Sequence, residues 1–237
     1  MKKIITVLSL MVGVVASAQI KQGSITYGMS IQNSPLSSMM GDMQIILYYK
    51  NAKSLTDMSS QLYSMKTLIT DTGTLTIMSA MGQKLYFKTP VLNPNSAAGK
   101  EPKIIYTAKT KEIAGYTCTK AFVITGGGQA VDTSVFWYTE KLPLIEFGKE
   151  GFLFKGLRGM PLEYEINIPQ MKMTMVAKSV STGDVPDSTF KLSTDGYTEI
   201  DPSKMLGGLQ QESRSTFILL ILIGTGDILI LRERVGG

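Results

Sequence analysis

Apolar and polar residues alternate along much of the chain, and a period of two residues is typical of a β-strand that buries one face. The clearest example runs from residue 161 to residue 180, where Pro169-Gln170 separates two alternating runs. Two such runs with a short break predict a hairpin with one apolar and one polar face. The apolar face would carry Leu162, Tyr164, Ile166, Met171, Met173 and Met175. Glu163 and Glu165 would face the lysines of the second strand, a favourable cross-strand pairing.

Similar runs, rich in Ile, Val, Thr, Tyr and Phe, predict strands along the rest of the chain. They are Ser24–Ile31, Met43–Lys50, Leu62–Thr70, Thr74–Ser79, Lys84–Lys88, Lys103–Ala108, Tyr116–Thr125 and Ser134–Thr139. Short helices are expected at Pro35–Met43 and Pro202–Leu209, because each begins with proline directly after a capping residue. We therefore predict a mainly β fold, a single antiparallel sheet curled over one core, with short helices covering an opening.

The first 18 residues have the three parts of a secretory signal peptide. Two lysines precede an apolar run from Ile4 to Val15, and Ala16-Ser17-Ala18 supplies the small residues of a cleavage site. The apolar run is too short to span a bilayer. The mature chain would begin at Gln19, and we expect it in the periplasm, secreted, or elsewhere in the cell envelope.

Composition excludes several kinds of function. The chain contains no histidine, so it lacks the usual general base near neutral pH and imidazole ligands for zinc or copper. The formal net charge of +5 is spread out, without a basic cluster interleaved with aromatic residues, which makes nucleic acid a poor partner. The single cysteine, Cys118, fits either a small buried residue or a thiol that pairs between chains.

Two motifs resemble catalytic elements but have simpler interpretations. Glu163 and Glu165 are spaced like a pair of glycosidase carboxylates, yet alternation places both on a solvated polar face. Ser188-Thr189-Phe190-Lys191 matches S-x-x-K, but the S-D-N and K-T-G elements of penicillin-binding proteins are absent, and the segment reads as a strand. We therefore predict no catalytic residue, cofactor or metal, and the protein is not expected to be an enzyme.

Four segments, in order along the chain, resemble a secreted bacterial family known as domain of unknown function 4412. They are Lys111–Ala121 (KEIAGYTCTKA), Val135–Thr139 (VFWYT) with Leu142-Pro143, Gly156–Glu165 (GLRGMPLEYE), and Val185–Leu192 (VPDSTFKL) with Gly196-Tyr197. That family is related in fold to LolA and LolB, the periplasmic carrier and outer-membrane receptor of lipoproteins. The resemblance covers about Gly23 to Leu206. It implies a half-open β-barrel capped by helices, with a C-terminal strand at Val185–Leu192 and a concave apolar face that shields acyl chains. We assign this domain to residues 19–209.

Residues 210–237 form an atypical apolar tail. Phe217–Ile223 and Ile228–Leu231 are rich in Ile and Leu, whereas the preceding domain is rich in Met and Thr. Interrupted by Gly224-Thr225-Gly226-Asp227, these runs make a poor transmembrane span, and none is predicted. Three interpretations stay open: a strand-turn-strand appendage, a sequence altered by frameshift, or an anchor to a membrane or partner.

Two functional hypotheses fit these patterns. The first is a non-enzymatic envelope protein that binds a lipid, a lipoprotein acyl chain or an apolar peptide on the concave sheet. Its ligand-binding residues would be Leu162, Tyr164, Ile166, Met171, Met173 and Met175, with Met39 and Met40 on a lid helix. The alternative is an envelope scaffold with a filled barrel that contacts another protein through an edge strand or its tail. The 15 methionines suit either an adaptable apolar surface or an ordinary core.

Overall fold

A computed structural model of the chain describes residues 20–32, 44–59, 63–80, 82–90, 102–127, 130–145, 156–168 and 171–201. Four predicted features lie entirely outside these residues: the signal peptide, the helix at Pro35–Met43 with Met39 and Met40, the helix at Pro202–Leu209, and the tail over residues 210–237. The strands are β1 (Gln22–Gln32), β2 (Gln44–Lys50), β3 (Lys53–Ser59), β4 (Tyr63–Thr70), β5 (Gly73–Ala80), β6 (Gln83–Pro90), β7 (Lys103–Ile113), β8 (Tyr116–Gly127), β9 (Ala130–Thr139), β10 (Met160–Ile168), β11 (Met171–Ser181) and β12 (Thr198–Glu199). One 3-10 turn, η1 (Asp187–Phe190), precedes β12.

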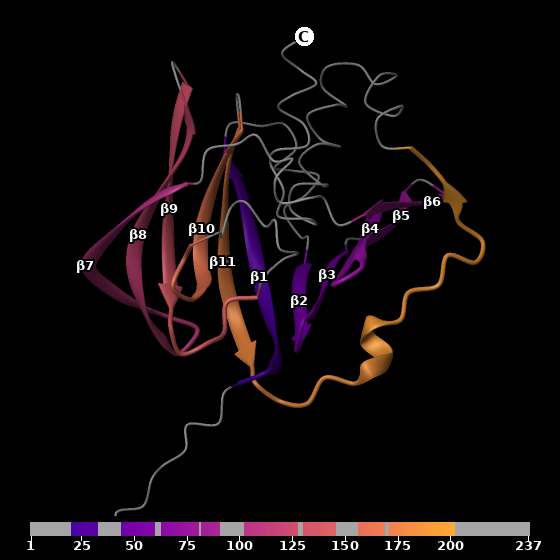
Figure 1. Cartoon of the computed structure of the whole chain (residues 1–237), viewed down its shortest axis with the longest axis horizontal. Helices are drawn as coiled ribbons and strands as arrows, with labels where there is room; N and C mark the ends of the chain where they lie inside the picture. The colour runs from indigo at the N-terminus through magenta and orange to yellow at the C-terminus, as the bar shows by residue number, and fades with distance from the viewer. Residues whose placement is uncertain are drawn as a thin grey trace, which may run out of the picture.

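All twelve strands belong to one sheet, in the order β12-β6-β5-β4-β3-β2-β1-β11-β10-β9-β8-β7. Neighbouring strands run antiparallel, except that β12 lies parallel to β6. The end strands β12 and β7 do not pair with each other, so the sheet is open (Figure 1). The predicted mainly β fold with a half-open sheet is therefore confirmed. None of the helical segments in the described part of the chain is long and apolar enough to cross a membrane.

Tight turns explain why successive strands pair directly. β7 and β8 are joined by Ala114-Gly115, with φ values of 49° and 81°. Positive φ at both central residues is the requirement of a type I′ turn, whose twist matches that of the flanking strands. Asn51, between β2 and β3, also has a positive φ, 54°. Such turns fix the register, and the register decides which side chains share a face.

The core lies on one face of the sheet, which we call the inner face. The register aligns one row of inner-face residues across six strands: Tyr27, Ile45, Met58, Met65, Met78 and Leu85. On the other side of β1, Ala177 lies opposite Tyr27 and Met175 lies opposite Met29. Five members of the row are buried, and Leu85 packs against them.

The segment after β11 crosses the opposite, outer face of the sheet. Val185 and Phe190 pack against Leu55 of β3 in a second small cluster, and η1 lies over this strand. The chain then adds β12 to the edge of β6, where Ile200 N–H donates a hydrogen bond to the Tyr86 carbonyl oxygen at 2.9 Å. We call residues 182–200 the strap (orange to yellow in Figure 1). The prediction of a strand at Val185–Leu192 is wrong, because this segment contains a 3-10 turn that docks on the outer face.

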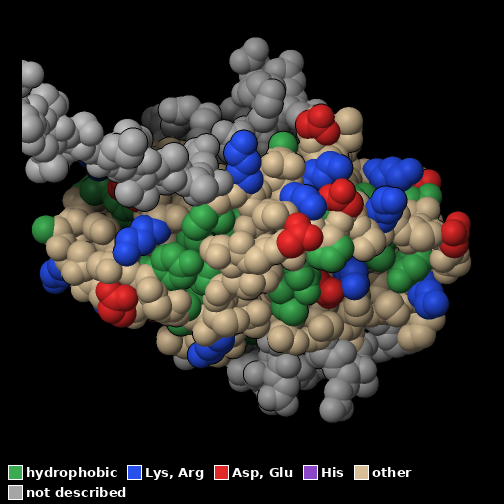
Figure 2. Space-filling model, turned by 90° about the horizontal axis from the view of Figure 1, so that it is seen from below, with side chains coloured by type: hydrophobic (Ala, Val, Ile, Leu, Met, Phe, Trp, Pro, Cys, Tyr) green, Lys and Arg blue, Asp and Glu red, His purple; other side chains and the backbone are tan. Residues whose placement is uncertain are grey.

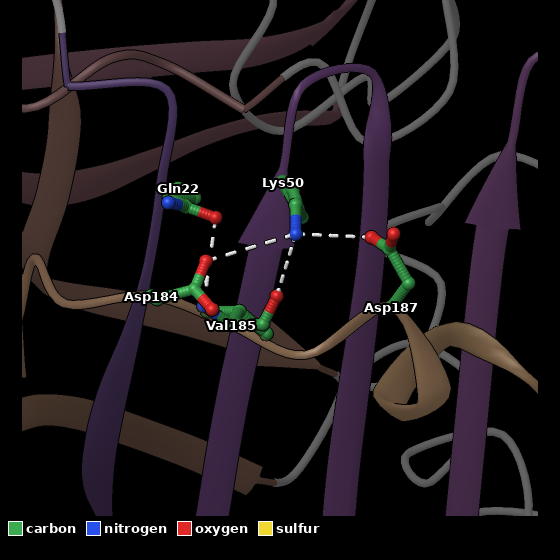
Figure 3. A network of polar contacts seen from close by, with 5 residues as sticks. All are labelled: Gln22, Lys50, Asp184, Val185 and Asp187. Carbon is green, nitrogen blue, oxygen red and sulfur yellow. Dashed lines mark hydrogen bonds and ion pairs between the residues drawn. The ribbon is translucent and has the colours of Figure 1, made fainter.

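Lys50, at the end of β2, holds the beginning of the strap (Figure 3). Its Nζ donates a hydrogen bond to the Val185 carbonyl oxygen at 2.8 Å and lies 3.0 Å from Asp187 and 3.8 Å from Asp184. Val185 N–H in turn donates to Gln22 Oε1 at 3.5 Å. Hydrogen bonding to Lys50 lowers the pKa of Asp187, and the same contact raises the pKa of Lys50.

Candidate functional site

The predicted ligand-binding residues of β10 and β11 meet on the inner face. The register places Ile166 opposite Met173 and Tyr164 opposite Met175, as the predicted hairpin requires. Leu162, Ile166, Met173 and Met175 are fully buried members of the main core. The structure therefore brings these residues together as predicted, in a packed arrangement. That they contact a ligand stays a prediction.

Tyr164 sits among aromatic rings rather than at an open surface. Its ring stacks on Phe136 of β9 with centroids 5.7 Å apart, and it meets Tyr27 of β1 edge to face at 5.9 Å. Burial raises the pKa of Tyr164, so the phenol remains protonated at neutral pH. The backbone of Met171 pairs with Ile168, whereas the Met171 side chain lies outside the described residues, as do Met39 and Met40.

A methionine row on the other half of the sheet was not predicted as part of the site. Met58, Met65 and Met78 are direct cross-strand neighbours on β3, β4 and β5, and all three are buried. Neighbouring strands lie about 4.8 Å apart, so three flexible thioether side chains form one continuous strip. The two-residue turn at Asp71-Thr72 places Met65 opposite Met78, and this was the sequence signal that could have revealed part of the row.

The polar face of β10 carries ion pairs. Glu165 lies 2.9 Å from Lys172 of β11, which confirms the predicted cross-strand pairing. Glu163 instead lies 2.7 Å from Lys111 of β7, whose Nζ is also 4.3 Å from the centroid of the Trp137 ring. Each carboxylate is therefore paired with its own lysine, on a different strand.

The remaining candidates are a cysteine and a surface. Cys118 is fully buried, as expected for a small core residue, and burial raises the pKa of its thiol to about 11. The thiol is therefore protonated and unreactive at neutral pH.

Figure 2 shows hydrophobic side chains in small patches among lysines and acidic residues. Of the large hydrophobic side chains in the described ranges, Ile105 alone is exposed, at 42%.

Within the residues that the structure describes, no group of three or more His, Cys, Asp or Glu side chains is placed to hold a metal ion. The candidate site is the inner face of the sheet, which carries the methionine row on one half and Met173 and Met175 on the other.

No family model matches the chain, and no curated protein matches it.

Proposed function

We propose that the protein is an exported protein of the cell envelope that binds a hydrophobic ligand on the inner face of its sheet. The ligand would be a lipid, a lipoprotein acyl chain or an apolar peptide, and we propose no catalytic role. The observation that carries this proposal is the apolar row from Tyr27 to Leu85, which runs across an open sheet and includes three adjacent methionines.

An open sheet suits the uptake of a bulky apolar molecule. The end strands β12 and β7 are not joined by a ladder, so they can move apart without breaking the hydrogen bonds between neighbouring strands. Methionine has three flexible side-chain torsions and a polarizable sulfur, so the same row can pack against itself or against ligands of different shapes. Apolar surface that a ligand removes from water stabilises the complex by about 25 cal/mol per Å².

The amino-terminal sequence supports a location outside the cytoplasm, because residues 1–18 have the parts of a signal peptide. The four segments that resemble domain of unknown function 4412 support a role like that of the LolA and LolB lipoprotein carriers. Both arguments come from sequence patterns. The first supports the cell envelope as the location, and the second supports acyl chains among the apolar ligands.

A second candidate is an envelope scaffold with a filled core. It is favoured by the complete burial of Leu162, Ile166, Met173 and Met175. It is also favoured by β7, an eleven-residue strand at the end of the sheet whose one strand partner in the described part of the chain is β8. An unpaired strand edge can accept an extended segment of another protein through main-chain hydrogen bonds. Under this hypothesis the methionine row is ordinary core.

Photolabelling with a fatty acid that carries a diazirine group distinguishes the two candidates. We expect label on inner-face residues of β3, β4, β5 and β11, located to single residues by fragmentation of the peptides, with the signal removed by excess unlabelled fatty acid. Outer-face Leu55 and Leu68 provide an internal control, since they pack against the strap and should remain unlabelled. Label only on outer-face or edge residues, or no competed label at all, would contradict lipid binding and favour the scaffold.

A further inference from the structure

A row of hydroxyl groups runs beside the methionine row on the inner face. Thr56, Thr67 and Thr76 are direct cross-strand neighbours on β3, β4 and β5. They lie two residues along each strand from the methionines, or about 7 Å. Their exposed fractions are 5%, 1% and 1%, and Ser54, two residues before Thr56, is 2% exposed. We call these four residues the hydroxyl row.

The burial of these side chains calls for an explanation. The structure describes six buried polar or charged residues, and four of them form the hydroxyl row. A hydroxyl that leaves water completely without a hydrogen bond costs about 1–3 kcal/mol in proteins. Thr67 and Thr76 reduce this cost by bonding each other, and the Ser54 and Thr56 oxygens are not among the fully buried, unpartnered oxygens of the described residues. Valine has the shape of threonine and an equally good strand propensity, so an ordinary core would have favoured it at these positions.

The hydrogen bonds within the row leave capacity for a further partner. Thr67 Oγ1 and Thr76 Oγ1 are 3.2 Å apart and share one hydrogen bond. Each hydroxyl has one proton and two acceptor positions, so one proton of this pair remains available. Among the described residues, the side chains of Ser54 and Thr56 make no hydrogen bond. The row therefore presents both donors and acceptors on the inner face.

The charge distribution restricts what this partner can be. Strand alternation places no charged residue on the inner face of β3, β4 or β5. The charged side chains adjacent in sequence to the row are Lys53, Asp57 and Lys66, and alternation places all three on the outer face. Asp57 and Lys66 pair with each other there at 2.9 Å. With no cation beside it on these three strands, the row cannot by itself offset the cost of burying a phosphate or carboxylate. Its chemistry suits an uncharged group that carries hydroxyls.

We propose that the hydroxyl row binds the uncharged, hydroxyl-bearing end of an amphiphile, such as glycerol or a sugar, while the acyl chain lies along Met58, Met65 and Met78. This inference rests on the proposed function, because it assigns the two ends of the ligand to two adjacent rows of the same face. It selects neutral amphiphiles over charged lipids and plain hydrocarbons.

The test compares monooleoylglycerol with methyl oleate, which has the same acyl chain and ester but lacks the two glycerol hydroxyls. Affinities are measured by displacement of a fluorescent acyl probe from the mature protein. We expect the parent to bind monooleoylglycerol about tenfold more tightly, the effect of one or two net hydrogen bonds. The variant Thr67→Val/Thr76→Val should bind both compounds with about equal affinity, and its affinity for methyl oleate should equal that of the parent.

Removing both hydroxyls of a bonded pair leaves neither partner unsatisfied, so the double variant is expected to fold. Thr56→Val is a second variant that leaves the Thr67–Thr76 bond intact and should also reduce the preference. Thr174→Val, whose side chain alternates with the inner-face residues Met173 and Met175, is the matched control and should keep the parental preference.

The two proposals fail in different ways. If the parent binds neither compound, the proposed lipid-binding function is wrong, and this inference is wrong with it. If the parent binds both compounds equally, or the valine variants keep the tenfold preference, the hydroxyl row is not a ligand site and lipid binding stands. Tighter binding of oleate than of monooleoylglycerol would contradict the preference for a neutral end.

Discussion

The hydroxyl of Tyr27 in β1 donates a hydrogen bond of 2.8 Å to the carbonyl oxygen of Pro161 in β10, across the intervening strand β11. The register of β10 against β9 shifts between Pro161 and Glu163, and such a bulge disrupts the regular ladder. Tyr27 thus supplies a partner where the ladder is irregular. Burial raises the pKa of Tyr27 well above its usual value, so the hydroxyl remains a donor.

The first prediction concerns this bond. Tyr27→Phe should lower the free energy of unfolding by about 2 kcal/mol, because it removes a hydrogen bond and leaves a buried carbonyl without its partner. Urea denaturation measures the change. Tyr48→Phe is the control, since Tyr48 packs against the outer cluster, and it should change stability by less than about 0.5 kcal/mol. Equal stability of Tyr27→Phe and the parent would show that the bond contributes nothing.

The second prediction concerns alkaline pH. Burial raises the pKa of Tyr27 and Tyr164, and it raises the pKa of Tyr49 to about 12. Above the unfolded value of about 10, the unfolded chain releases protons that the native chain keeps. The unfolded state then binds fewer protons, so stability falls as the pH rises; below pH 10 this contribution is fully present. Because the chain has no histidine, stability should be nearly constant from about pH 6 to 8.

Tyr49→Phe tests the source of this alkaline loss. The Tyr49 hydroxyl is buried and makes no hydrogen bond within the described part of the chain, so its removal should cost little at neutral pH. We expect urea denaturation at pH 7 and pH 11 to show a smaller difference for the variant than for the parent. A larger difference would mean that Tyr49 is ionised in the native state.

The third prediction separates the apolar and ionic anchors of the strap. Phe190→Ala should lower the free energy of unfolding by about 3 kcal/mol, because the ring is buried against Leu55. Lys50→Met should have a much smaller effect that disappears in high salt, since Asp184 and Asp187 are exposed. Limited proteolysis within residues 182–200 provides the local measurement. Faster cleavage of Lys50→Met than of Phe190→Ala would show that the ionic contacts are the main anchor.

The fourth prediction concerns Gly159, where the chain enters β10. A Cβ atom there would clash with the Thr139 carbonyl oxygen, and a backbone atom cannot move aside as a flexible side chain can. Gly159→Ala should therefore lower stability by about 3 kcal/mol in thermal unfolding. Gly183→Ala is the control, because its nearest contact would be an ordinary 3.5 Å from Ser181 Oγ. Similar unfolding temperatures for both variants would place Gly159 farther from Thr139.

The hairpin of β10 and β11 was predictable because its alternation is regular and its turn is short. β3 was missed, and the reason is its inner face. Ser54 and Thr56 occupy buried positions where the strand pattern expects apolar residues, so the alternation is not visible in the sequence. The same two hydroxyls made the hydroxyl row impossible to distinguish from a polar loop.

The strap could not be predicted from local patterns either. Val185 and Phe190 have the composition of a strand, but their partner, Leu55, lies 130 or more residues earlier in the chain. The methionine row depends in the same way on the register of three strands. Local alternation thus predicted most strands and one half of the candidate site, whereas contacts between distant segments decided the other half.

Native mass spectrometry, combined with lipid extraction, tests the central claim most directly. The mature chain would be purified from a bacterial periplasm without detergent and measured intact. The proposed function predicts near-stoichiometric phospholipid, neutral amphiphile or acylated peptide that co-purifies with the protein and leaves when the chain is unfolded. A clean ligand-free mass that does not change when lipids are added would contradict it, and would identify the inner face as a closed core.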